Sequence, residues 1–473
     1  MSKLNVARPA AAPVYTHEGA RAIRGTPIDQ LRRTVLACML WEDGYYEDGK
    51  TISDRIKELV AQCRPDQVAE LAIKAREGGR LRHVPLLLAR ELARDSSRFK
   101  VAPLLARVIQ RADELAEFLA IYKRDSKALS AQVKLGLGMA LRKFDEYQLD
   151  KYKSDGKQFS LRDVMFLAHA KPEGGRERYN KEARREERRL GATAKLSDKE
   201  RLYRRLANKE LAQANTWEKR LSAGEDKKTV FTELLTRREN GSIGLGYMAL
   251  LRNLRGMVDA GVDIDLIRKE ILAGAPKSKA LPFRFIAAAR AVPQLERALD
   301  TAMVVSMTSM ERLEGETIVL VDVSGSMEDK LSGKSDLTRM DAGAALSVLL
   351  RGVCDDVRVF TFSDSLCEVP ARHGMALVDA IVKSQKHGGT YMGLAVSDVM
   401  RIVPNAKRLI VFTDEQSADV VKSPKDGMKG YIVNVATSKH GVGDGPWVRI
   451  NGFSEAVVQY IAELERLDAE VQS

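Results

Sequence analysis

The sequence predicts a multidomain protein in which a stack of α-helices precedes an α/β doubly wound domain. Three observations carry this prediction. The 473 residues exceed what one ordinary hydrophobic core accommodates. Residues 26–310 read as short helices with no alternating strand pattern, whereas apolar strand-like runs alternate with helical stretches from about residue 316. We therefore expect a flexible lead-in over 1–20, a helical domain over 21–310 and an α/β domain over 311–473.

Helix start and stop signals recur along the helical part. Thr26 can cap a helix whose first residue is Pro27, and Pro65 opens a run that stops at paired glycines. Ser160 and Asp163 are placed to cap LRDVMFLAHA, which ends before Lys171-Pro172. A single bundle of this length would be unusual, whereas stacked helix pairs can extend indefinitely. Helix density alone thus predicts an irregular HEAT-like solenoid, because no clean repeat motif is present.

The α/β part is predicted from four apolar runs: ETIVLVDVSGSM, VRVFTFSD, RLIVFTDE and GYIVNVATS. Helical stretches such as MDAGAALSVLLRGVCD lie between them. Buried strands that alternate with helices indicate a parallel sheet covered on both faces. Ligands of such sheets bind at the carboxyl ends of the strands. The polar residues that fall at these ends are Asp322, Ser324, Ser326 and Asp414.

The strongest local motif is Asp322-Val323-Ser324-Gly325-Ser326, directly after a predicted strand. Its carboxylate and two hydroxyls can converge on a hard cation, although an Asx or Ser turn explains the bare motif equally well. Thr390 after two glycines and Asp414 at the end of IVFT favour the metal. The arrangement resembles the metal-ion-dependent adhesion site of von Willebrand A-type domains. The resemblance implies Mg²⁺, or another divalent cation, on Asp322, Ser324, Ser326, Thr390 and Asp414, with a position left for an acidic protein ligand.

The net charge of +12 is divided unevenly along the chain. From Glu311 onward there are 18 basic and 24 acidic residues, a net of −6. Subtraction from the totals of 77 and 65 leaves 59 basic and 41 acidic residues before Glu311, a net of +18. A solvated surface of mixed charge does not predict an excess confined to one part. A polyanionic partner does, and nucleic acid leads that class.

Several segments of the helical part resemble the TROVE module of bacterial-type Ro ribonucleoproteins, in the order of that family, over about residues 20–305. They are LRRTVLACMLWEDGYYEDG, LRHVPLLLARELAR, GLGMALRKFDEY, DKYKSDGKQFSLRDVMFLAHAKP, TWEKRLSAG, GYMALLRNLRGMVDAGV and LPFRFIAAAR. The resemblance implies a ring of helical repeats with small structured Y-like RNA on its outer surface and single-stranded ends of misfolded RNA in its hole. It also implies a role in RNA quality control and an exoribonuclease that can be tethered through RNA. The charged stretch 173–199 has no secure counterpart in that family.

The candidate RNA-binding residues interleave with aromatic residues on one stretch of the helical part. Cations can neutralise phosphates and rings can stack on unpaired bases. A core position explains Phe159 and Tyr147 more readily than it explains the cations, and a helix-capping role is the ordinary explanation for His169. The resemblance implies that His169 contacts Y RNA. The candidates are Arg142, Lys143, Lys151, Lys153, Arg162, His169 and Lys171. The run 181–206 is a second basic segment, weakened by glutamates that can form i,i+4 pairs.

Other functional classes find less support. With six histidines the chain has no HExxH motif or His/Cys cluster, and no catalytic constellation is visible, so we expect no enzyme. The GLGYMA stretch at Gly244 matches a loose dinucleotide fingerprint but follows no strand, which favours helix packing. No apolar run is long enough for a membrane span, and the first residues do not resemble a secretory signal. Four cysteines without a CxxC pair favour reduced thiols and a cytoplasmic protein. An assembly factor acting through the metal site is the alternative to an RNA scaffold.

Overall fold

The structure is a computed structural model of the 473-residue chain. It describes residues 14–16, 19, 21–22, 26–37, 49–77, 81–95, 99–124, 128–153, 156–172, 198–214, 216–236, 243–278, 280, 282–308, 310, 312–331, 336–436, 441–443, 445–451, 457–458, 461–462 and 464–465. The chain divides into two compact units: unit 1 comprises residues 1–55 and 226–473, and unit 2 comprises residues 56–225.

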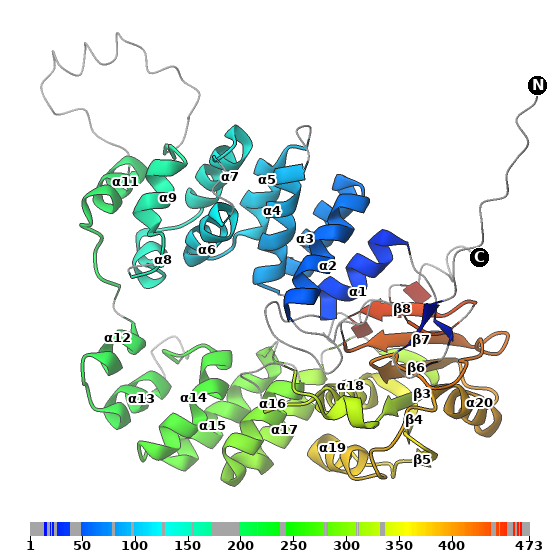
Figure 1. The fold of residues 1–473 in the computed structure, drawn as a ribbon. Coiled ribbons are helices and arrows are strands. Elements are labelled where there is room, and N and C mark those ends of the chain that lie inside the picture. The colour runs from blue at the N-terminus through cyan, green and yellow to red at the C-terminus, as the bar shows by residue number, and fades with distance from the viewer. Residues whose placement is uncertain are drawn as a thin grey trace, which may run out of the picture. The chain divides into compact units, whose positions relative to one another are not determined.

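Unit 2 consists of helices in its described residues (Figure 1). Helix α2 (Gly49–Gln62) contains the division between the units. The others are α3 (Pro65–Glu77), α4 (His83–Asp95), α5 (Val101–Val108), α6 (Ala112–Lys123), α7 (Ala131–Leu141), α8 (Glu146–Lys151), α9 (Leu161–Leu167), α11 (Asp198–Asn208) and α12 (Trp217–Ser222). The caps follow the sequence: Ser160 and Asp163 form a reciprocal capping box at the start of α9, as expected.

The helices of unit 2 stack in two layers. Helix α3 packs on α5, α5 on α7 and α7 on α9, while α4 packs on α6 and α6 on α8. Successive helices such as α3 and α4 also pair with each other. Each helix therefore meets its partner and the helices two positions away, which is the arrangement of HEAT-like repeats. The predicted solenoid is confirmed for this part of the chain.

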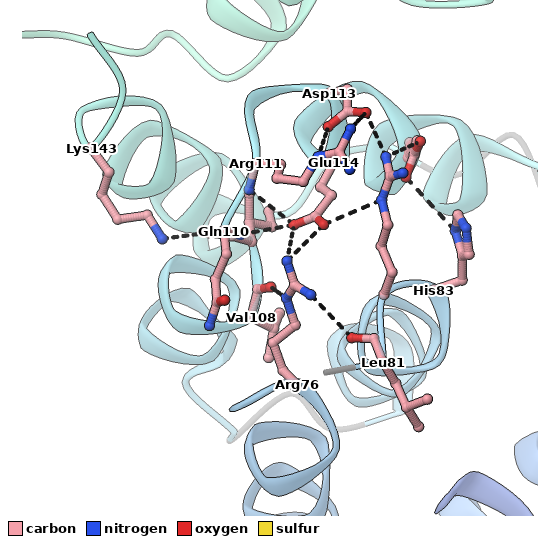
Figure 2. A network of polar contacts seen from close by, with 12 residues as sticks. Arg76, Leu81, His83, Val108, Gln110, Arg111, Asp113, Glu114 and Lys143 are labelled. Atoms are coloured by element: carbon pink, nitrogen blue, oxygen red, sulfur yellow. Dashed lines mark hydrogen bonds and ion pairs between the residues drawn. The ribbon is translucent and has the colours of Figure 1, made fainter. Parts of the chain in front are cut away.

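A buried ion pair joins two turns of this stack (Figure 2). The Arg76 guanidinium of α3 donates to both carboxylate oxygens of Glu114 on α6, at 2.8 and 3.1 Å, and to the Val108 carbonyl at 2.9 Å. Glu114 is fully buried and also accepts from the backbone N–H groups of Gln110 and Arg111. Because both oxygens of the carboxylate accept hydrogen bonds and Arg76 carries the opposite charge, the Glu114 charge is tolerated inside the stack.

Unit 1 begins with a short hairpin and one helix and continues with a further set of helices. These elements are β1 (Val14–Tyr15), β2 (Arg21–Ala22), α1 (Pro27–Ala37), α13 (Lys227–Leu235), α14 (Tyr247–Asp259), α15 (Ile264–Gly274), η1 (Ala275–Lys277), α16 (Pro282–Ala291), η2 (Pro293–Leu295) and α17 (Glu296–Met307). Thr26 caps α1, as the sequence predicts, and the Asp29 side chain accepts in turn from the Thr26 N–H. The GLGYMA stretch forms a turn and the first helical residues of α14, which favours the helix-packing interpretation.

The rest of unit 1 is a six-stranded sheet with helices on both faces. Its elements are β3 (Leu313–Asp322), η3 (Gly325–Glu328), α18 (Arg339–Val353), β4 (Cys354–Phe362), β5 (Leu366–Glu368), α19 (Gly374–Val382), α20 (Met392–Ile402), β6 (Arg408–Thr413), β7 (Lys429–Asn434) and β8 (Val448–Asn451). The strand order is β5-β4-β3-β6-β7-β8, and all pairs are parallel except the antiparallel edge strand β5. The doubly wound α/β prediction is confirmed, with β5 and β8 as strands that it did not include.

Alternating residues of β3 face the two helical layers. Ile318 and Leu320 belong to a core cluster with α20, whereas Val321 lies against Gly343 of α18 on the opposite face. Figure 1 shows α18 and α20 on either side of the strands. Helix α18 is buried almost throughout, because it packs on the sheet and also on α16 and α17. Of the described helices, none is long and apolar enough to cross a membrane.

The two-layer stacking of helices continues from the helical part of unit 1 into its α/β part. Helix α14 packs on α16 and α16 on α18, while α15 packs on α17 and α17 on α19. The Arg290 guanidinium of α16 binds the Asp341 carboxylate of α18 in two contacts. Residue 310, where we placed a domain boundary from the sequence, therefore lies inside a single packing unit.

Candidate metal centre and nucleic-acid interface

The carboxyl ends of the two central strands, β3 and β6, carry Asp322 and the residue after Thr413, Asp414. The chain passes from β3 to β4 on one side of the sheet, whereas β6, β7 and β8 follow one another on the other side of β3. The two carboxylates therefore lie between adjacent strands whose connections run in opposite directions. Ligands of open α/β sheets bind at this point. Both carboxylates are fully buried. The structure thus brings together the two acidic residues that the sequence singled out.

Hydrogen bonds order the loop after β3. The Ser324 hydroxyl and backbone N–H donate to Asp322 Oδ1 at 2.6 and 2.9 Å, and the Ser326 hydroxyl lies 3.4 Å from that of Ser324. The Thr413 hydroxyl donates to Asp322 Oδ2 at 2.7 Å. Sequence reasoning missed Thr413, since a threonine that ends a β-strand is ordinarily a propensity choice.

The third segment of the site carries Thr390. The Gly325 N–H donates to the Gly388 carbonyl at 3.2 Å, which places the two loops side by side. Thr390 is buried, and its carbonyl accepts from the Ala418 N–H at 2.8 Å, next to the loop that follows Asp414. Three loops from distant parts of the sequence therefore meet at one edge of the sheet, as predicted.

The electrostatics of the site favour a cation. Burial, and after it the nearby Asp414 carboxylate, raise the pKa of Asp322 to about 7, while hydrogen bonds from Ser324 and Thr413 oppose the shift. Burial also raises the pKa of Asp414, and Asp414 Oδ2 is buried without a hydrogen-bond partner. Within the described residues no group of three or more His, Cys, Asp or Glu side chains is placed to hold a metal, so a cation bound here would need the hydroxyl groups as ligands beside the two carboxylates. An all-oxygen set with an unsatisfied carboxylate oxygen fits Mg²⁺.

The predicted RNA-binding residues all lie in unit 2, around the ends of α7, α8 and α9. Arg142 Nε donates to the Lys171 carbonyl at 3.0 Å, which ties the end of α7 to the segment after α9. His169 is exposed and has a φ of +49°, just past α9. The structure therefore brings Arg142, His169 and Lys171 to one end of the stack.

Lys143 is bound to backbone carbonyls, as Arg142 and Arg162 also are. Its ammonium donates to the carbonyls of Ala106 and Ile109 at the end of α5, and burial lowers its pKa. A lysine that satisfies the last carbonyls of a helix stabilises that helix end. These bonds give Lys143 a structural role at the end of α5.

Two exposed aromatic rings on α8 and α9 each have a cation over the face. Lys151 Nζ lies 5.7 Å from the Tyr147 ring centroid, and the Arg162 guanidinium lies 5.2 Å from that of Phe166. Tyr147 is 47% exposed and Phe166 is 51% exposed, so the core interpretation of Tyr147 is wrong. Phe166 was missed, although the buried positions 161, 164, 165 and 168 of α9 leave residue 166 outside the apolar face.

The remaining lysines make loose contacts. Lys151 Nζ lies 3.8 Å from a Glu218 carboxylate oxygen, and Lys153 Nζ lies 3.8 Å from one of Asp150. Both contacts are longer than a hydrogen bond, and the Lys151 and Lys153 side chains are 26% and 47% exposed. The second basic run is described only from residue 198, and there Lys199 donates to the carbonyls of Arg142 and Phe144 at the end of α7.

Two comparisons with known proteins found matches, one to a protein family and one to a solved structure. Residues 205–341 match the TROVE domain family. Among solved structures, the chain is similar to the crystal structure of Deinococcus radiodurans Ro (RSR) protein. The similarity has a TM-score of 0.59 and 17% sequence identity and covers 91% of this chain and 97% of that one. No curated protein sequence matches the chain. The structural similarity shows that this chain has the fold of that protein over most of its length, and the domain match lies within the same region.

Proposed function

We propose that this chain is an RNA-binding scaffold or chaperone of Ro type with no chemistry of its own. It binds small structured, Y-like RNA on the surface formed by the ends of α7, α8 and α9. It binds single-stranded ends of misfolded RNA at a second surface, which the family resemblance assigns to the hole of a ring. The domain match and the structural neighbour support RNA binding of Ro type, and the net charge of +18 before Glu311 agrees with a polyanionic partner.

The observation that carries the proposal is the pair of exposed rings with cations beside them. Tyr147 with Lys151, and Phe166 with Arg162, offer aromatic faces for unpaired bases next to charges for phosphates. His169, exposed at the end of the same helix as Phe166, extends this surface.

The metal site serves a different purpose in this proposal. Asp322, Ser324, Ser326, Thr390 and Asp414 hold Mg²⁺, which when bound supplies a coordination position for the carboxylate of a partner protein. The chain's own hydrogen bonds orient the ligands, since Thr413 and Ser324 fix the Asp322 carboxylate. An exoribonuclease tethered through RNA and an acidic protein ligand are the partners we propose, in the cytoplasm. The alternative function, an assembly factor acting through this site alone, is favoured only by the burial of its two carboxylates.

The test uses the full chain and two probes, a structured hairpin RNA and an unstructured oligouridine. Lys151→Gln with Lys153→Gln should weaken hairpin binding and flatten its salt dependence by about one unit for each lost phosphate contact. Oligouridine should lose less affinity, because it binds elsewhere. Arg64→Gln with Lys74→Gln is a control of equal charge, since both cations are exposed in the same unit and are bound to Asp66 at 2.7 Å and to Glu70 at 2.8 Å. Equal losses for both probes, or for the control, would indicate attraction by net charge and not a dedicated surface.

A further inference from the structure

Three arginines on two neighbouring helices of unit 1 face no carboxylate among the described residues. Arg252 and Arg255 lie on α14 and are exposed, and Arg284 lies on α16 and is half-buried. Helices α14 and α16 pack against each other. All three residues fall inside the stretch that matches the TROVE domain family. None of them belongs to the RNA surface proposed above, which lies in unit 2.

The surroundings of Arg284 are unfavourable to a cation. Burial lowers the pKa of its guanidinium, and the positive charge of Arg252 lowers it further. Arg284 also lies in the first turn of α16, which contains no acidic residue and where the helix dipole presents its positive end. The Phe283 ring, whose centroid lies 4.6 Å from the guanidinium carbon, holds the group in place. Positive charge therefore accumulates at a half-buried position.

Other buried or half-buried arginines of unit 1 have partners. Arg290 binds Asp341 through two nitrogens, and the fully buried Arg408 binds both carboxylate oxygens of Glu465 at 2.8 and 2.7 Å. Such pairing is the normal condition for a desolvated guanidinium. Arg284 has no such carboxylate partner among the residues that the structure describes. An anion from outside the chain would supply the missing partner.

We propose that Arg252 and Arg284 form a second RNA contact, which binds phosphodiester groups of single-stranded RNA. The inference rests on the proposed RNA-binding function and adds a site to it. Guanidinium groups bind phosphate through two nitrogens, and the Phe283 ring fixes the plane of the Arg284 group before RNA arrives. A half-buried guanidinium favours a flexible single strand, because a rigid duplex presents its phosphates only on a convex surface. Arg255, exposed on α14, adds to the attraction.

The test compares Arg284→Gln with Arg268→Gln in the full chain. Arg268 is exposed on α15 and binds Asp265 at 2.8 Å, so its loss changes net charge equally without removing an unpartnered cation. A phosphate contact with single-stranded RNA contributes a salt slope of about 0.7, which corresponds to about fourfold in affinity at about 0.15 M salt. We expect Arg284→Gln to weaken oligouridine binding about fourfold and the Arg252→Gln/Arg284→Gln variant about fourteenfold, with slopes smaller by about 0.7 and 1.4. Arg268→Gln should leave both unchanged.

Thermal unfolding separates this role from a structural one. Removing a half-buried charge beside Arg252 should leave Tm unchanged or raise it, whereas a structural arginine would lower Tm when lost. Equal affinity losses for Arg284→Gln and Arg268→Gln would overturn the proposal. A second pair of results would also overturn it. If inorganic phosphate raises Tm of the unaltered chain but not of the double variant, while the double variant still binds oligouridine, the site binds a free anion and not RNA.

The outcome also distinguishes this inference from the proposed function. If the unaltered chain binds neither RNA probe, the proposed function fails and this site fails with it. If hairpin binding responds to Lys151 and Lys153 while oligouridine binding ignores Arg252 and Arg284, only the present inference is wrong.

Discussion

A substitution of His169 can separate an effect on RNA binding from an effect on the stability of the fold. It follows α9 in the left-handed region, with φ of +49°, and the Ala170 N–H next to it donates to the Met165 carbonyl at 2.9 Å. This is the helix-end position at which glycine is the usual residue, because a side chain there meets the backbone. A histidine that merely ended the helix would be better replaced by glycine. We therefore expect His169→Gly to spare the fold and impair RNA binding.

The magnitudes follow from the geometry. A residue with a Cβ pays about 1–2 kcal/mol in the left-handed region, which glycine avoids. Glycine loses about 0.4–1 kcal/mol more backbone entropy on folding than a residue with a side chain. The free energy of unfolding should therefore stay constant or rise by up to about 1.5 kcal/mol. A ring that stacks on a base contributes about 1–3 kcal/mol, so hairpin RNA binding should weaken by between about fivefold and more than hundredfold.

Lys209→Gly is the matched control. Lys209 follows α11 in the same unit with φ of +63°, is exposed, and the Glu210 N–H beside it donates to the Arg205 carbonyl at 2.8 Å. Urea unfolding and fluorescence anisotropy with hairpin RNA measure the two quantities for both variants. We expect similar stability changes in the two variants and a large affinity loss for His169→Gly alone. Unchanged hairpin affinity in His169→Gly, with its stability raised, would refute an RNA contact by His169.

Two further predictions concern the buried charges. Asp322→Asn should abolish the Mg²⁺ uptake measured by calorimetry, and it should raise Tm in the absence of metal because it removes one of the two buried carboxylates of the site. Asp426→Asn, on an exposed turn, is the control and should change neither quantity. Unchanged Mg²⁺ uptake would rule out the site as described. Glu114→Ala leaves Arg76 buried without its partner and should lower the free energy of unfolding by about 3–5 kcal/mol. Glu77→Ala removes an exposed partner of Arg107 and should cost less than about 1 kcal/mol, so equal losses in urea unfolding would contradict this reading of Figure 2.

The sequence predicted those features of the fold that local chemistry determines. The capping residues Thr26 and Ser160 begin helices as expected, and the four apolar runs form β3, β4, β6 and β7. Strands β5 and β8 are too short to show a pattern, and their pairing depends on neighbours distant in sequence. The packing of α16 and α17 on α18 could not be predicted either, since Arg290 and Asp341 carry no sign in the sequence that they meet.

The candidate sites also contain some features that the sequence indicates and others that depend on packing. The metal site could be predicted because its ligands follow strand ends, which a parallel sheet brings to one edge. The RNA surface could be predicted only as a basic stretch: whether Lys143 meets a phosphate or the carbonyls of Ala106 and Ile109 depends on how α5 and α7 pack. Exposure of Phe166 follows from the helical periodicity of α9 and was available from the sequence. The lack of a carboxylate near Arg284 required the three-dimensional structure.

The central claim is that structured RNA binds unit 2 at the ends of α7, α8 and α9. Ultraviolet crosslinking of the full chain to a structured hairpin RNA, followed by mass spectrometry of the attached peptides, tests it most directly. We predict crosslinked peptides from residues 142–171, with Tyr147, Phe166 or His169 among the modified positions, and their loss in Lys151→Gln/Lys153→Gln. Crosslinks confined to residues 311–473, or spread evenly over the basic residues of both units, would contradict the account.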